Sequence, residues 1–189
     1  MSQQVLHLDF VSLSPASGAQ DRQQLIEAAA ALAAIDGVIA SGVIEDEAGS
    51  GSDFDLAFYF VLNDFATLEP FGTDPRYSRF LQGEVAPRLR AFAGADVRLE
   101  DDFAASAGRG DVIAVMAPDE TYDWEVRDAL LAWAGATGAT TSTIGLAAGE
   151  RQAYRGVALA FGDTLQEAPA PDPQRFRATV LQGMSRRLA

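Results

Sequence analysis

The chain has 189 residues, of which 48% are apolar, and its formal net charge is −13 at pH 7. This length suits one domain of ordinary size or two small ones, and the composition is that of a chain that folds. The negative charge opposes contact with phosphate backbones and anionic lipid surfaces, so we expect neither nucleic acid nor a membrane as a partner.

The absence of cysteine excludes disulfides, thiol nucleophiles and cysteine-based metal sites. The N-terminus does not read as a signal peptide, and no run of about 20 apolar residues could span a bilayer. Neither acidic triplet, at 45–47 or at 100–102, has the spacing of a calcium loop. We therefore expect a cytoplasmic protein without a metal or another cofactor.

The first elements are a strand and an amphipathic helix. Residues 5–11 alternate as a strand does, with apolar side chains on one face and His7 and Asp9 on the other. From Asp21 to residue 35 the apolar residues follow a helical stripe. Asp21 and Gln24 have the spacing of a capping box, and Gly37 suits the end of the helix.

Two more strands and a second helix follow. Residues 37–44 and 54–62 read as strands, and a Gly/Ser-rich turn is expected between them at 48–52. Asp74 and Pro75 form a typical helix start. The helix they begin is expected to carry apolar residues from Tyr77 through Leu89 to Phe92, and residues 95–99 are expected to form a short fourth strand. The order βαββαβ is the ferredoxin-like plan.

The second half repeats this plan. Strands are predicted at 111–117, 139–146 and 154–161, and a helix at 126–134, where Trp124 and Trp133 are expected to pack in the core. Asp172-Pro173 parallels Asp74-Pro75 and predicts the second helix of this copy, which would then lack a clear fourth strand. The predicted division is a first unit at 1–102, a linker at 103–110 and a second, degenerate unit at 111–189.

Four segments of the first half together resemble the stress-responsive A/B-barrel (Dabb) family. They are Leu6-His7-Leu8, Ile35-Asp36-Gly37-Val38, Asp53-Phe54-Asp55-Leu56-Ala57-Phe58 and Phe71-Gly72-Thr73-Asp74-Pro75-Arg76-Tyr77. The resemblance implies an α+β fold whose antiparallel sheet packs against that of a partner to form a dimeric α+β barrel. Two tandem ferredoxin-like copies would build this barrel within one chain as a self-contained pseudo-dimer. The alternative is that the chain still recruits a second copy as a homodimer.

Some relatives in this family are polyketide cyclases, and their His-Pro-x-His segment is altered here. Asp74 and Tyr77 stand at the two His positions, and Phe71 stands at the preceding aromatic. Tyr, with an ordinary pKa of about 10, is a poor general base near neutral pH. The catalytic candidates are His7, the only histidine, together with Tyr77 or Tyr59. A pocket between sheet and helices would place Phe58, Phe71, Asp74 and Phe80 against a ligand.

Two functional hypotheses remain open. The first is a non-catalytic Dabb-type protein that binds a small hydrophobic or aromatic ligand. The second is a cofactor-independent, polyketide cyclase-like lyase that uses His7 with Tyr77 or Tyr59. A cavity beside His7 with at least two converging polar groups would favour the second.

Overall fold

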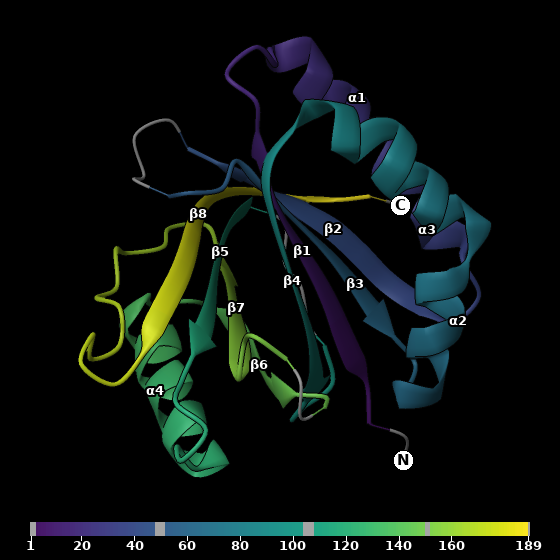
Figure 1. Ribbon diagram of the computed structural model, residues 1–189. Coiled ribbons are helices and arrows are strands. Elements are labelled where there is room, and N and C mark those ends of the chain that lie inside the picture. Colours follow the sequence, from purple (N-terminus) through teal and green to yellow (C-terminus); the bar gives the residue numbers. More distant parts are fainter. Residues whose placement is uncertain (1–2, 48–51, 104–107, 150–151, 189) are drawn as a thin grey trace.

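Eight antiparallel strands close into a barrel in the computed structural model, which describes residues 3–47, 52–103, 108–149 and 152–188 (Figure 1). Around the barrel the order is β1-β3-β2-β8-β5-β7-β6-β4. The strands are β1 (Val5–Leu13), β2 (Val38–Asp46), β3 (Leu56–Leu62), β4 (Leu89–Leu99), β5 (Gly108–Met116), β6 (Thr141–Ala147), β7 (Gly156–Gly162) and β8 (Arg177–Arg187).

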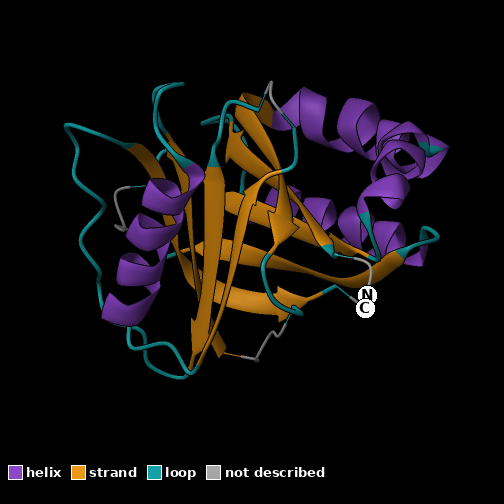
Figure 2. Ribbon diagram, turned by 90° about the horizontal axis from the view of Figure 1, so that it is seen from below, coloured by secondary structure: helices purple, strands orange, loops and turns teal. Residues whose placement is uncertain are grey.

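Helices cover two opposite sides of the barrel (Figure 2). The helices α1, α2 and α3 lie over the first half of the sheet, and α4 lies over the second half. The helices are α1 (Ala19–Ala30), α2 (Leu68–Thr73), α3 (Pro75–Arg79) and α4 (Asp123–Ala136). Shorter helical turns are η1 (Ala31–Ala34), η2 (Phe65–Thr67), the π-helical η3 (Phe80–Val85) and η4 (Ala86–Arg88).

The barrel consists of two sheets with the same strand order. The first sheet runs β4-β1-β3-β2 and the second runs β8-β5-β7-β6, which is the ferredoxin-like arrangement in both halves. Two seams join them: Gly42–Asp46 of β2 pairs with Gly183–Arg187 of β8, and Val97–Leu99 of β4 pairs with Gly145–Ala147 of β6. The predicted fold class, a tandem pair of ferredoxin-like units forming an intramolecular α+β barrel, is confirmed.

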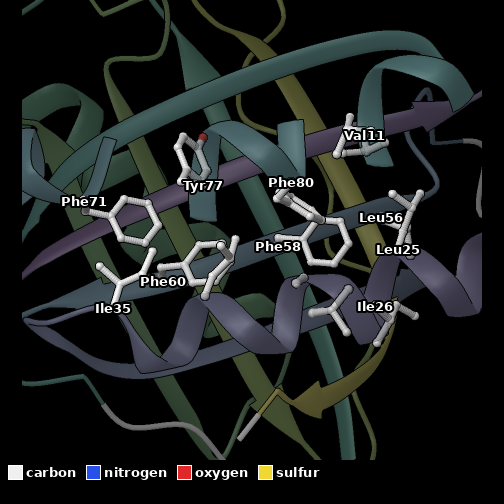
Figure 3. Packing of buried hydrophobic residues seen from close by; sticks show 14 of the residues in the cluster. Val11, Leu25, Ile26, Ile35, Leu56, Phe58, Phe60, Phe71, Tyr77 and Phe80 are labelled. Atoms are coloured by element: carbon white, nitrogen blue, oxygen red, sulfur yellow. The ribbon is translucent and has the colours of Figure 1, made fainter. Parts of the chain in front are cut away.

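Alternation along the strands divides the apolar side chains among three cores. Even-numbered residues of β1, such as Leu8 and Phe10, fill the barrel interior, whereas Val5 and Val11 face the helices. One outer core lies between the first sheet and its helices (Figure 3). The other lies between the second sheet and α4.

The predicted second helix is shorter than expected. It ends at Arg88, and Leu89 and Phe92, which were expected on its apolar face, belong to β4. Pro87 disfavours continuation of a helix, and β4 extends back to Leu89 so that it can pair with Leu13 at the end of β1. The short strand predicted at 95–99 is therefore only the last part of an 11-residue strand.

The first helix begins earlier than its sequence pattern suggested. Its N-cap is Gly18, whose N–H donates to Asp21 Oδ2 at 2.9 Å, so Asp21 lies in the first turn instead of capping it. The helix ends at Ala30, the turn η1 follows, and the C-cap of that turn is Ile35, so the prediction that Gly37 caps the helix was wrong. Gly37 lies two residues further on, with φ of 90°, a conformation that favours glycine.

The prediction for the end of the second unit was wrong. Asp172 begins only a turn, in which its Oδ1 accepts from the N–H of Gln174, and β8 occupies the place of the predicted helix. The unit thus has a fourth strand, and the described residues between β7 and β8 form no helix. Gly183 permits the close pairing of β8 with β2, because a Cβ at this position would lie 1.6 Å from the carbonyl oxygen of Glu45 across the seam.

The boundaries of the expected connectors also differ. Strand β5 begins at Gly108, inside the linker expected at 103–110. Residues 104–107 of that linker and 48–51 of the expected turn lie outside the described residues. Among the helices of the described ranges, none has the length and apolar character needed to cross a membrane.

Candidate functional site

The histidine cluster. His7 is the third residue of β1 and lies on the face of the sheet that is covered by the helices. Its neighbours across the strand pairs are Phe60 on β3 and Asp96 on β4. Asp9, two residues further along β1, shares this face, and Tyr77 reaches it from α3. Four polar side chains from three elements therefore meet between the first sheet and α3.

A continuous chain of hydrogen bonds joins these four residues. His7 Nδ1 lies 2.6 Å from Asp96 Oδ1, and His7 Nε2 lies 2.8 Å from the hydroxyl of Tyr77. The Tyr77 hydroxyl in turn donates to Asp9 Oδ2 at 2.9 Å. Because the hydroxyl proton of Tyr77 is donated to Asp9, His7 Nε2 must donate its own proton to the Tyr77 oxygen. His7 Nδ1 faces a carboxylate oxygen of Asp96, which accepts, so both ring nitrogens carry hydrogen.

The electrostatics agree with a charged ring. Burial of His7 opposes its charge, but Asp9 and Asp96 outweigh that effect and raise the pKa of His7 to about 10. Asp9 Oδ1 lies 3.3 Å from Nε2. Burial, followed by the charge of Asp9, raises the pKa of Tyr77 well above its ordinary value. His7 is therefore an imidazolium near neutral pH, and Tyr77 is a neutral hydroxyl.

The aromatic residues expected at a ligand pocket are packed in the core. Phe71 lies beside the His7 ring, 5.1 Å between centroids, and Phe58 and Phe80 meet edge to face at 5.5 Å. All three are at most 3% exposed (Figure 3). Asp74 caps α3 by accepting from the N–H of Arg76 at 2.8 Å, and the Arg76 side chain beside it lowers its pKa to about 2.

Tyr59 lies on the other face of the sheet from His7. It points into the barrel interior, where its ring approaches Phe103 and Phe161. Burial raises its pKa despite the neighbouring Ser185 and Arg187. The structure thus brings Tyr77, and not Tyr59, to His7, because odd positions of β3 pair with even positions of β1.

Asp96 is a member of the cluster that the sequence analysis did not identify. It stands in an apolar stretch that was predicted only as a short closing strand, and the register of β4 against β1 decides its role. Antiparallel partners directly across from each other share a face, so a correct pairing of the two strands would have identified it. Gln152 also contacts Asp96, with Nε2 3.3 Å from Oδ2.

The second unit has a polar pair at the corresponding position. Asp111 on β5 pairs with Gln182 on β8, as His7 on β1 pairs with Asp96 on β4. Gln182 Nε2 donates to Asp111 Oδ2 at 3.0 Å, and burial raises the pKa of Asp111. The second unit therefore has a carboxylate at the position of the His7 imidazole, and the positive charge of Arg109 partly offsets the effect of burial on its pKa. Within the described ranges, no three acidic or histidine side chains are placed to hold a metal ion.

The α4 groove. The missing second helix leaves a groove in the second unit, between α4 and the extended segment 169–176. We call it the α4 groove; its volume is about 430 Å³. In Figure 1 this segment runs beside α4 and leads into β8. The groove is lined by Trp124, Glu125, Asp128, Ala129, Ala132, Trp133, Ala136, Pro169, Ala170, Pro171, Asp172, Arg175 and Phe176.

The two tryptophans of the groove differ in burial. Trp133 is 2% exposed and belongs to the core, as expected, whereas Trp124 is 59% exposed, so the prediction that it packs in the core was wrong. An exposed indole beside a largely apolar groove is a typical feature of a ligand-contacting surface. Two further cavities, one beside the start of α1 and one near Arg155, have more polar linings.

Comparison with known proteins shows the fold. No protein-family model matches the sequence, and no curated protein proved similar to it. A candidate monooxygenase from Lactobacillus acidophilus NCFM is 12% identical over 97% of this chain and 94% of its own, with a TM-score of 0.58. A candidate chlorite dismutase is 13% identical over 100% of this chain and 96% of its own, and its TM-score is also 0.58.

A single-unit structure is also similar. A Dabb family protein with a ferredoxin-like fold from Mesorhizobium loti MAFF303099 is 18% identical, covers 55% of this chain and 100% of its own, and has a TM-score of 0.45. At these identities the likeness concerns the fold. The chain is thus a two-unit α+β barrel, and each unit has the ferredoxin-like strand order.

Proposed function

We propose that the protein is a non-catalytic, Dabb-type barrel that binds a small hydrophobic or aromatic ligand in the α4 groove. The observation that carries the proposal is the groove itself, a cavity of about 430 Å³ with Trp124 exposed at its side. Cavities of this size that combine aromatic side chains with a few polar groups are the usual form of a small-molecule site.

The state of His7 supports a non-catalytic protein. Both of its ring nitrogens are engaged by side chains of the chain, so neither remains for a substrate. A pKa of about 10 also leaves little neutral imidazole at pH 7 to act as a base. The His7 cluster instead ties α3 to β1 and β4.

Tryptophan fluorescence tests the proposal directly, because the chain has only two tryptophans and both line the groove. We expect saturable energy transfer from tryptophan to N-phenyl-1-naphthylamine, an uncharged hydrophobic probe. The variant Ala132→Phe fills the groove from an exposed position and should abolish it. Leu131→Phe, at a neighbouring exposed position outside the groove, is the matched control. Absence of saturation, or equal binding by Ala132→Phe, would contradict the proposal.

A second candidate function is favoured by the hydrogen-bond chain through His7. Contacts of 2.8 and 2.9 Å could carry a proton between His7 and Asp9 through Tyr77, as an acid–base lyase or cyclase would require. Titration of the single histidine by NMR separates the two candidates. A pKa near 10 agrees with the non-catalytic protein, and a pKa near 7 would replace it with the acid–base enzyme.

A further inference from the structure

The charges around the α4 groove are mostly negative. Glu125 is neutralised by an ion pair with Arg175. Asp128 has no hydrogen-bond or ion-pair partner among the described residues, and the carboxylate of Asp172 accepts only from the backbone N–H of Gln174 within those residues. The groove therefore carries two carboxylates without a cationic partner in the described chain.

The aromatic side chains of the groove add a second attraction for positive charge. The face of an indole attracts an ammonium group, and Trp124 is exposed where Asp128, four residues along α4, shares its side of the helix. An anionic ligand would meet repulsion from the two free carboxylates and from the net charge of the chain.

A buried donor at the groove points independently to a ligand. Trp133 is 2% exposed and lines the groove, yet its Nε1–H has no acceptor within the described ranges. Buried polar groups are nearly always hydrogen-bonded. A ligand with a hydroxyl or carbonyl oxygen placed against Trp133 would complete this hydrogen bond.

From these three observations we infer that the ligand of the α4 groove is a small organic cation, an ammonium group on a short apolar body with an oxygen acceptor. The inference rests on the proposed function and adds the charge of the ligand. The ammonium group lies between the Trp124 ring and the carboxylate of Asp128. The apolar body contacts Phe176 and the alanines of α4, and the oxygen faces Trp133.

A matched pair of probes tests the charge. Choline and 3,3-dimethylbutan-1-ol have the same shape and the same hydroxyl, and they differ only in the positive charge. Followed by tryptophan fluorescence at low salt, choline should bind about 10-fold more tightly, and added salt should reduce this advantage. Asp128→Asn should remove most of the difference in affinity between choline and the neutral alcohol. Asp101→Asn removes the same charge from an exposed position outside the groove and should leave it intact.

The outcomes separate this inference from the function on which it rests. The inference of a cationic ligand is wrong if the neutral alcohol binds as tightly as choline, or if Asp101→Asn weakens choline binding as much as Asp128→Asn does. In either case the proposal that the groove binds a ligand is unaffected. If neither probe binds while the uncharged naphthylamine does, the inference fails alone. If all three fail to bind, both proposals fall.

Discussion

At the scale of single residues, His7 is a charge held by two carboxylates in a mostly buried place. Its side chain is 12% exposed and that of Asp9 is 1% exposed. Removal of one partner from a buried ion pair leaves the other charge uncompensated, which costs more than the pair itself contributes. Loss of His7 should therefore leave a buried acidic group without its partner in the first unit.

This loss of a partner predicts a specific rescue. His7→Gln should lower the free energy of unfolding by about 3 kcal/mol, because the Asp9 carboxylate loses its cation. Addition of Asp9→Asn should recover at least about 1 kcal/mol of that loss, since the amide needs no counter-charge. Urea denaturation of the wild type, the two single variants and the double variant measures both effects. Additive losses would show that the two side chains are not coupled.

Stability should also depend on pH in a direction set by His7. Its pKa is higher in the folded chain, about 10, than the ordinary 6.5, so its contribution is fully present below pH 6.5 and is lost as pH rises through 10. The free energy of unfolding should fall over this range by up to about 1.4 kcal/mol per pH unit. The chain has no lysine or cysteine, so few other groups titrate there. The double variant His7→Gln/Asp9→Asn serves as control and should show a much flatter profile; an equal slope would contradict the assignment.

At the scale of elements, the helices of the first unit pack on a closed core. Phe80 of η3 meets Phe58 of β3 edge to face, and both are almost fully buried. Phe80→Ala should therefore cost about 3–5 kcal/mol of stability, as expected when a buried aromatic leaves a cavity. Phe92→Ala on β4, where the side chain is 41% exposed, should cost much less. Thermal unfolding followed by circular dichroism compares them, and tolerance of Phe80→Ala would instead indicate a pocket.

The two Asp-Pro segments have similar sequences but different structures. Asp74 begins a helix as its sequence predicts, and its carboxylate accepts the N–H of Arg76. Asp172 makes the same local contact with Gln174, but the chain then joins β8 between β5 and β2. The local signals for a helix start are equal, and the difference comes from the open strand edges that only the assembled barrel provides.

Alternation in the strands, by contrast, was visible in the sequence. The period-2 pattern correctly separated His7 and Asp9 from the barrel-facing residues of β1. It could not place Tyr77 or Asp96 beside His7, because these contacts depend on the position of α3 over the sheet and on the register of β4. The α4 groove was equally invisible, since it arises from a helix that is absent.

At the scale of the whole molecule, the barrel depends on its two seams. At the β2–β8 seam Gly183 lies so close to the Glu45 carbonyl that no side chain fits. Gly183→Ala should thus lower the free energy of unfolding by more than about 2 kcal/mol, because the backbones must separate. Gly135→Ala in α4, where a Cβ meets nothing within 4 Å, should stabilise the protein by roughly 0.5–1 kcal/mol. Urea denaturation tests the pair; a harmless Gly183→Ala would contradict the tight seam.

The seams within a single chain have a further consequence. In a barrel made of two identical protomers, every substitution appears twice, so a change that opens one side also opens the other. In this chain the two halves are encoded separately, so a substitution in one half leaves the other unchanged. One half can retain the charged cluster that fixes its helices, while the other exchanges a helix for an extended segment and gains a groove. Covalent linkage of the copies thereby permits a division of labour that a symmetric pair could not adopt.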